Sequence, residues 1–319
     1  MNFSTLDLNL LRVLDALLHE GSTAKAGQRI GLSQPAVSAA LKRLRHALGD
    51  PLFVRRGQGI EPTDFAEGLK GPLRSHLDGL QTLLDAGRAF DPAAATDTFK
   101  LSGSDYFAEM LMPELADLLS RRAPLMRVQL VDLVPDGHID TLDRYEVDIA
   151  MIPEMEFPPW VRTQHLLWAQ FSVIARNGNR RIARLGVTPG DEIPLDPFCD
   201  MGHVLFSPEG NFKGMGDMAL AKVGRERRVV MTSPYFNGVA RAVSRSELIA
   251  LVPTVFAERV ATYLPLSLYA APIPLPVTEV LMVWHQRSTA NPAHRWLRDQ
   301  IAEVLAPYAG ADLMTEGDD

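Results

Sequence analysis

Hydrophobic positions up to residue 50 recur at the spacing of three successive helices. The first apolar stripe predicts a helix over residues 7–20. Its buried positions are Leu10, Val13, Leu14, Leu17 and Leu18. Gly21 ends this helix, and Ser22 or Thr23 can cap a second helix over residues 24–30. After a turn at Gly31, Ser33 can cap a third helix.

The third predicted helix has two different faces. Its inward positions are Val37, Ala40, Leu41, Leu44 and Leu48. The opposite side carries Gln34, Ser38, Lys42 and Arg45, at spacings of four, four and three residues. An amide, a hydroxyl and cations on one helix face can bind base edges and phosphates in a major groove. The alternative is the solvated face of an ordinary three-helix bundle, but the short helix–turn–helix spacing favours binding.

A small hairpin is predicted after these helices. Residues 53–56 and 60–63 have strand character, and Gly57 and Gly59 flank the turn between them. The hairpin would place Arg55 and Arg56 beside the helices as a wing, suited to phosphates or a minor groove. As isolated arginines they would be plain surface charge. The full candidate set for DNA contact is Thr23, Ser33, Gln34, Pro35, Ser38, Lys42, Arg45, Arg55 and Arg56.

A long amphipathic helix is predicted to follow from Asp64. Beginning with Phe65, its apolar positions recur every three or four residues. The candidate contact positions are Leu69, Leu73, Leu77, Leu80 and Leu84. This stripe needs a partner, which is either the chain's own body or a second copy. Gly71 and Pro72 are expected to kink the helix.

From residue 97 onward, short apolar strands alternate with helical segments. Strands are expected at 99–102, 127–133, 147–151, 203–206, 228–232, 248–252 and 278–284, with one long strand at 165–175. Helices are expected at 106–122, 139–145, 212–223, 235–244 and 292–305. This alternation is typical of parallel sheets with helices on both faces.

Composition supports a globular chain of more than one domain. The 319 residues are 46% hydrophobic and 22% charged, which excludes wholesale disorder. The net charge is −7, but residues 1–63 hold eight Lys/Arg against five Asp/Glu, a net +3, so the rest carries −10. A basic head on an acidic body suits a DNA-binding module.

With no apolar run long enough to span a membrane and no signal-peptide pattern, we expect a soluble, cytoplasmic protein.

Several motifs in the head and body carry a family resemblance. The segment 33–38 (SQPAVS), followed by Leu41, Leu44, Leu48-Gly49 and the segment 50–55 (DPLFVR), resembles the signature of LysR-type transcriptional regulators. The match runs from about residue 6 to 63. The body is similar in layout and in the segments 101–105, 148–150 and 248–253, and reads closest to the nodulation-regulator and aromatic-catabolism-regulator subgroup. One departure is Gly27, where the family usually has alanine, and glycine there should cost the helix about 1 kcal/mol.

The resemblance implies an architecture of three parts. A winged helix–turn–helix DNA-binding domain, mostly α, would cover residues 1–63, and a linker helix for dimerisation would cover 64–90. Residues 91–319 would form an α/β, periplasmic-binding-protein-like effector domain. Its subdomain I would hold about 97–166 and 273–306, and its subdomain II about 167–272, joined by crossing strands near Trp168 and Ile273. The implied partners are a pseudo-palindromic operator, a small-molecule effector, further copies in a homodimer or homotetramer, and RNA polymerase if the protein activates.

The effector site is predicted beyond the carboxyl ends of the strands, where helix N-termini point at ligands. Ser104 follows the first strand of the body and is expected to donate to the ligand. The other candidates are Trp168, Phe206, Ser207, Lys213, Tyr235 and Phe236. Aromatic walls with one cation suggest an aromatic or other small carboxylate, although relatives that take aromatic acids often have histidine where this chain has Ala169. In the competing interpretation Lys213 is merely solvated, and the aromatic residues belong to the core.

Catalytic and metal-binding motifs were weighed against this interpretation. The eight histidines form no HxH or HExxH pair, Cys199 is the single cysteine, and no GxSxG segment occurs. We therefore expect no metal, no cofactor and no enzymatic activity. Three hypotheses remain: a ligand-responsive transcription regulator, a DNA-binding architectural or silencing protein whose body only oligomerises, and an enzyme fused to a winged helix.

Overall fold

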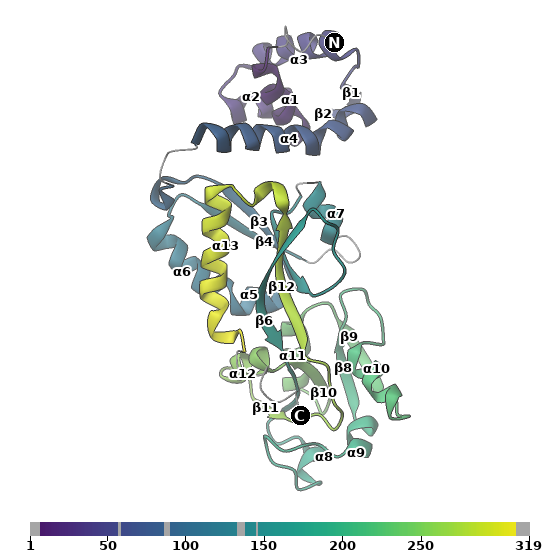
Figure 1. Ribbon diagram of the computed structural model, residues 1–319. Coiled ribbons are helices and arrows are strands. Elements are labelled where there is room, and N and C mark those ends of the chain that lie inside the picture. The colour runs from purple at the N-terminus through teal and green to yellow at the C-terminus, as the bar shows by residue number, and fades with distance from the viewer. Residues whose placement is uncertain (1–6, 57–58, 86–89, 133–137, 145, 311–319) are drawn as a thin grey trace. The chain divides into compact units, whose positions relative to one another are not determined.

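The chain divides into two units in the computed structural model (Figure 1). The first is centred on Met1–Ala89, and the second covers Phe90–Leu142 and Glu146–Asp319. We call them the head and the body. The structure describes residues 7–56, 59–85, 90–132, 138–144 and 146–310.

The head is a winged helix–turn–helix, as the sequence predicts. Its elements are α1 (Asn9–Glu20), α2 (Thr23–Ile30), α3 (Gln34–Leu48), β1 (Phe53–Arg56), β2 (Gly59–Pro62) and α4 (Asp64–Asp85). The side chain of Ser22 accepts from the backbone of α2, and that of Ser33 from the backbone of α3. Both helices end at a glycine with positive φ, Gly31 at 71° and Gly49 at 71°. The first helix starts two residues later than predicted, and Asp7 accepts from the Asn9 N–H there at 3.0 Å.

The glycine at position 27 has a steric reason. A Cβ atom there would lie 2.5 Å from the carbonyl oxygen of Leu32. The turn between α2 and α3 therefore comes closer to α2 than an alanine allows. Gly27 lowers the helix propensity of α2, but its missing side chain allows the turn to approach the helix this closely.

The body holds two five-stranded sheets, and the first defines subdomain I. Its strand order is β4-β3-β5-β12-β6. The strands are β3 (Thr98–Ser102), β4 (Arg127–Val131), β5 (Ile149–Pro153), β6 (Val161–Ala169) and β12 (Thr278–His285). The helices are α5 (Asp105–Met110), α6 (Met112–Arg122), α7 (His138–Asp143) and α13 (Pro292–Leu305), with short 3-10 turns at Pro92–Ala94, Gln286–Ser288 and Ala306–Tyr308. Apolar side chains of α5, α6 and α13 pack on one face, and Leu142 of α7 packs on the other.

The second sheet defines subdomain II, with strand order β11-β7-β10-β8-β9. The strands are β7 (Phe171–Arg176), β8 (Gly202–Phe206), β9 (Arg228–Ser233), β10 (Ile249–Pro253) and β11 (Leu266–Tyr269). The helices are α8 (Arg180–Ala183), α9 (Leu195–Asp200), α10 (Met215–Lys222), α11 (Phe236–Ser244) and α12 (Thr254–Ala261). Residues of α11 and α12 pack in the same core cluster as α5, α6 and α13, so this part of the core is continuous across both subdomains.

Several predicted elements of the body need correction. The long strand predicted at 165–175 is two strands, β6 and β7, which belong to different sheets and are separated at Gln170. The helix predicted at 106–122 is interrupted at Leu111, and Pro113 follows in the first turn of α6. The sheets are mixed, because β12 runs antiparallel to β5 and β6, and β7 antiparallel to β10 and β11. The second crossing, near Ile273, is irregular backbone and not a strand.

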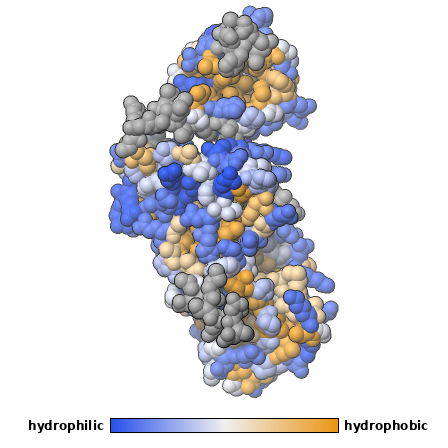
Figure 2. Space-filling view, viewed as in Figure 1, coloured by the Kyte–Doolittle hydropathy of each residue, from blue (hydrophilic) through white to orange (hydrophobic). Residues whose placement is uncertain are grey.

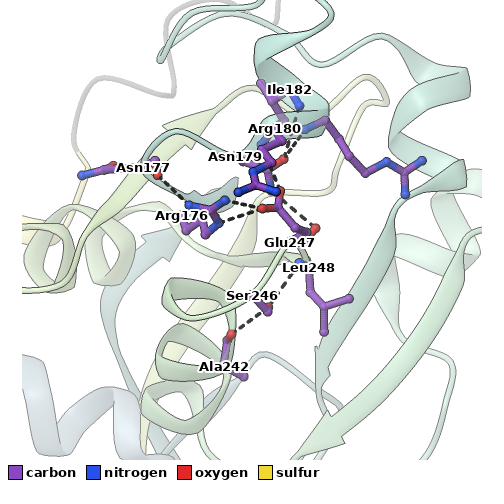
Figure 3. A network of polar contacts seen from close by, with 10 residues as sticks. Arg176, Asn177, Asn179, Arg180, Ile182, Ala242, Ser246, Glu247 and Leu248 are labelled. Carbon is purple, nitrogen blue, oxygen red and sulfur yellow. Dashed lines mark hydrogen bonds and ion pairs between the residues drawn. The ribbon is translucent and has the colours of Figure 1, made fainter.

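A polar network fixes the connection that leads from α11 into β10 (Figure 3). The carboxylate of Glu247 accepts from the Arg176 side chain on β7 and, at 2.9 Å, from the Arg180 N–H at the start of α8. The Ser246 hydroxyl donates to the Ala242 carbonyl at 2.8 Å and accepts from the Leu248 N–H. These hydrogen bonds hold the C-terminal end of α11 against the sheet of subdomain II. The N-terminal end of the helix faces subdomain I.

Candidate functional site

The outer face of α3 carries the candidate base contacts. Val37, Leu41 and Leu44 are buried in the head core, whereas Gln34, Ser38 and Lys42 are exposed. Spaced four residues apart, the three exposed side chains lie along one helix face. An amide, a hydroxyl and an ammonium are thus presented together from the N-terminal half of a helix, the part that enters a major groove in helix–turn–helix proteins.

Other candidates at the start of α3 support that helix. Ser33 is its N-cap, and its hydroxyl accepts from the Ala36 N–H at 3.4 Å. Pro35 lies in the first turn, where its missing N–H needs no partner. Nε2 of Gln34 donates to the hydroxyl of half-buried Thr23 at 3.4 Å, which ties the first turns of α2 and α3 together.

Arg45 has a structural role that the sequence did not reveal. Its Nε donates to the Pro51 carbonyl at 2.6 Å, and its second Nη to the Phe53 carbonyl at 2.9 Å. These bonds fasten the end of α3 to the beginning of the wing. Because two of its donors are used on the backbone, Arg45 positions the wing, and its contact with DNA remains a prediction.

The wing itself carries Arg55 and Arg56 on β1, and both are exposed. Arg56 lies opposite Gly59 in the antiparallel pair and forms a two-oxygen ion pair with Glu61 at 2.7 and 3.0 Å. An ion pair this exposed contributes little to stability, so the guanidinium can exchange Glu61 for a phosphate. Adjacent residues on a strand point to opposite faces, so the two arginines extend to different sides of the wing.

The predicted leucine stripe of α4 does not act as a single surface. Leu69 and Leu73 pack against the core of the head itself, and Arg74 holds α4 to α1 through Asp15 at 3.1 Å. Leu77 is half-buried, and Leu80 is 47% exposed. The side chain of Leu84 lies outside the described residues. Figure 2 shows apolar orange areas among the polar blue surface of the head, and Phe65 and Leu80 are among its exposed apolar side chains.

The candidate effector site is a cavity of about 320 Å³ in the body. Its lining comes from both subdomains and includes residues of β6 and β12 in the first sheet and of β7 in the second. The lining residues are Ser104, Tyr106, Phe107, Met151, Pro153, Leu167, Ala169, Phe171, Leu205, Phe206, Gly214, Met215, Gly216, Arg227, Phe236, Leu251, Pro253, Thr278 and Val280. This is the size and the largely apolar character of small-molecule sites in proteins.

Three of the seven predicted effector residues line this cavity. They are Ser104, Phe206 and Phe236, and the rings of the two phenylalanines stack with their centroids 3.7 Å apart. Trp168 lies between two lining residues on β6 and packs instead near His165, with 5.2 Å between the ring centroids. Alternation along the strand explains this, since Leu167 and Ala169 face the cavity.

The remaining three predicted effector residues lie elsewhere. Ser207 is buried, and its N–H donates to the Ser233 carbonyl at 2.8 Å. Lys213 is exposed and does not belong to the lining. Tyr235 is 46% exposed, and its hydroxyl donates to Asp132 of subdomain I at 3.2 Å, which raises the pKa of the tyrosine. The structure therefore removes Lys213 as the cation of the cavity.

Arg227 is the cation that the sequence analysis missed. Its side chain is 1% exposed and lines the cavity, where it forms a paired contact with Asp217 through Nε and Nη at 2.9 and 2.7 Å. Burial would raise the pKa of Asp217, but the hydrogen bonds and charge of Arg227 outweigh burial and hold it below the ordinary value. Asp217 also accepts from the Gly214 N–H at 2.7 Å. The only sequence signal was the charged run at 225–228, which gives no indication of burial.

Asp105, the neighbour of the lining residue Ser104, links the two subdomains. Its carboxylate accepts from the Phe236 N–H at 2.8 Å and from the Asn237 N–H at 2.8 Å, and it also accepts from the Asn237 side chain at 3.2 Å. A carboxylate of subdomain I thereby satisfies the first free N–H groups of α11 in subdomain II. This contact joins the two subdomains beside the lining residues Ser104 and Phe236.

Metal and membrane features are not found in the part of the chain that the structure describes. There, no three His, Cys, Asp or Glu side chains are grouped to hold a metal ion, and no helix is both long and apolar enough to cross a bilayer. Cys199 is buried, and burial raises the pKa of its thiol, which disfavours a nucleophilic thiolate.

Comparisons with known proteins agree with this geometry. The pattern of the bacterial regulatory helix-turn-helix protein, lysR family, matches residues 8–67, and that of the LysR substrate binding domain matches 93–306. The HTH-type transcriptional activator NahR of Pseudomonas putida is 33% identical, covering 96% of this chain and 99% of that protein. Nodulation protein D 1 of Bradyrhizobium sp. (strain NC92) is 31% identical, covering 98% and 97%. The crystal structure of the probable transcriptional regulator PA0477 from Pseudomonas aeruginosa superposes with a TM-score of 0.68 at 28% identity, covering 93% and 97%.

Proposed function

The chain belongs to the LysR family of transcriptional regulators, in the subgroup of nodulation and aromatic-catabolism regulators, and from this premise we propose a function for each unit. The head binds a specific pseudo-palindromic operator in double-stranded DNA. The body binds a small-molecule effector in its cavity and thereby changes transcription from the adjacent promoter. A bacterial regulator that binds operator DNA acts in the cytoplasm.

The DNA interface is supported by the exposed face of α3 and by the wing. Gln34 and Ser38 are suited to read base edges, since an amide can pair bidentately with adenine and a hydroxyl accepts several partners. Lys42, Arg55 and Arg56 are suited to phosphates, which position a protein without specifying sequence. Ser33, Pro35 and Thr23 hold the start of α3 in place, and the hydroxyls of Ser33 and Thr23 can in addition donate to phosphate oxygens.

Self-association is proposed through the linker helix. A palindromic operator requires two heads, and the exposed apolar surface around Leu77 and Leu80 on α4 is available to a second copy. Dimers of dimers would give the homotetramer that the family usually forms. If the protein activates transcription, RNA polymerase is its further partner.

One observation supports the proposal above all: the same chain has an exposed recognition helix, α3, and a separate cavity of the size of a small molecule. The cavity favours a ligand-responsive regulator over an architectural protein, whose body would need only association surfaces. It also favours regulation over catalysis, because the described residues of the lining include no nucleophile–base pair of the kind that covalent catalysis needs.

A thermal-shift screen of small molecules tests the ligand response. Full-length wild type is compared with Ala169→Phe, whose added ring fills part of the cavity. A cavity ligand raises the Tm of wild type by mass action and leaves the variant unchanged. Ala221→Phe, at an exposed position of α10, is the matched control and should respond as wild type does. If no compound distinguishes Ala169→Phe from the control while the protein still binds DNA sequence-specifically, the architectural hypothesis replaces the regulator.

A further inference from the structure

The charge inventory of the cavity limits what can bind there. Among the described residues that line it, Arg227 is the one charged side chain, and the others are apolar, aromatic or hydroxyl-bearing. An anionic ligand would therefore need either the Arg227 guanidinium or the free N–H groups at a helix N-terminus.

The guanidinium of Arg227 is already neutralised within the chain. Both oxygens of Asp217 accept from it, at 2.9 and 2.7 Å, in the fork geometry that satisfies arginine best. Its remaining Nη lies 3.5 Å from Nδ1 of His203. Nε2 of that buried histidine lies 2.8 Å from the Phe198 carbonyl, so the ring donates there and presents a lone pair to Arg227. At Gly216, a Cβ atom would lie 3.2 Å from the guanidinium carbon, so the missing side chain makes room for this pair.

The N-terminus of α11 is occupied in the same way. The N–H groups of Phe236 and Asn237 both donate to the carboxylate of Asp105. These are the groups that would otherwise attract a ligand anion toward the lining residue Phe236. The chain thus supplies its own carboxylate at both of these positions, the Arg227 guanidinium and the start of α11.

We propose that the cavity takes an uncharged aromatic ligand of one or two rings, whose polar groups are hydroxyls, and not a carboxylate. This deepens the proposed function and rests on it. A ligand carboxylate would add a third charge beside the neutral Asp217–Arg227 pair, inside largely apolar walls whose described residues offer it hydroxyl donors but no second cation. A neutral ring instead packs on the stacked phenylalanines, and its hydroxyl can pair with the hydroxyls of Ser104 or Thr278.

The size of the ligand follows from the cavity volume. An apolar protein cavity of about 150 Å³ is large enough for benzene. The cavity here, about 320 Å³, is about twice as large and suits two fused rings. The matched probes are therefore 2-naphthol, which is neutral near pH 7, and 2-naphthoate, which has the same ring system with a carboxylate.

Calorimetric titration of the full-length protein with both probes tests the proposal. Wild type should bind 2-naphthol at least about tenfold more tightly than 2-naphthoate. Asp217→Asn keeps the side-chain shape but leaves Arg227 an unpaired cation, so the preference should narrow or reverse. Asp105→Ala frees the N–H groups of α11, and should by itself also narrow the preference for 2-naphthol over 2-naphthoate. Asp196→Asn removes the carboxylate from the exposed Asp196–Arg225 pair outside the cavity, and should leave the preference unchanged.

Each alternative result has a distinct meaning. Binding of 2-naphthoate as tight as that of 2-naphthol in wild type overturns the ligand class, and so does binding of neither probe. An unchanged preference in both Asp217→Asn and Asp105→Ala overturns the charge argument. If Ala169→Phe binds 2-naphthol as wild type does, the ligand lies outside the cavity, and the proposed function fails at its site, whichever probe is preferred.

Discussion

Acidification should destabilise the body through two buried histidines. His203 is 0% exposed, and His294 is 2% exposed. In each ring one nitrogen lies within 3.2 Å of a backbone carbonyl and the other faces an arginine, which is Arg227 for His203 and Arg298 for His294. Protonation would place a second N–H against a guanidinium in the core. Burial first, and the arginine charge in addition, lower the pKa of each histidine from 6.5 to about 4.

The sign and magnitude follow from linkage. Above pH 6.5 both rings are neutral whether the body is folded or unfolded, so they add no pH dependence. As the pH falls below 6.5 the unfolded chain takes up protons that the folded body does not, and stability decreases until about pH 4. A pKa that falls from 6.5 to about 4 on folding corresponds to about 3 kcal/mol in the free energy of unfolding for each histidine. Together they approach the whole stability of an ordinary domain, about 5–15 kcal/mol.

Urea unfolding followed by tryptophan fluorescence measures this effect. All four tryptophans, Trp160, Trp168, Trp284 and Trp296, lie in the body, so the signal reports that unit. The free energy of unfolding should fall steadily between pH 6.5 and 4.5, and His203→Gln and His294→Gln should each reduce the slope. His46→Gln, an exposed site in the head, is the control and should not change it. A body whose stability is constant between pH 7 and 5 would refute the reasoning.

Three further predictions concern the head and its association. Gln34→Ala should reduce the difference in binding free energy between operator and random DNA by about 1–3 kcal/mol. Arg56→Ala should weaken binding to operator and random DNA alike, and should reduce the slope of log affinity against log salt concentration by about one. Fluorescence anisotropy at several salt concentrations distinguishes the two variants. Leu77→Glu should place a charge in the apolar seam between two linker helices, and light scattering should then show smaller particles; an unchanged mass would mean that the stripe packs on its own chain. Arg45→Met removes two hydrogen bonds to the wing backbone and should lower head stability by about 2 kcal/mol in thermal unfolding, while an effect on DNA affinity alone would return Arg45 to the phosphate contacts.

The head could be read from the sequence because its signals are local. Helical periodicity, Ser33 as a cap and Gly31 in a turn act within a few residues, and α3 follows from them. The role of Arg45 could not be read in the same way. Its acceptors are backbone carbonyls of the segment leading into the wing, and carbonyls carry no sequence signature.

The cavity shows where pattern reasoning fails in the body. Ser104, Phe206 and Phe236 could be predicted because they lie at or shortly after strand ends, where α/β sheets place ligands. Lys213 and Arg227 both lie in polar segments, and only the packing of α10 and β9 decides that one is solvated and the other is buried against Asp217. The break at Gln170 was missed for a related reason, because an apolar run does not show when a strand leaves one sheet and enters another.

Selection of duplexes from a randomised DNA pool by the full-length protein tests the central claim most directly. We expect wild type to enrich a pseudo-palindromic sequence with two half-sites, and Gln34→Ala to retain a similar amount of DNA with weaker enrichment at positions inside each half-site. Retention of DNA with no enriched sequence in wild type would contradict the claim that the exposed face of α3 reads an operator.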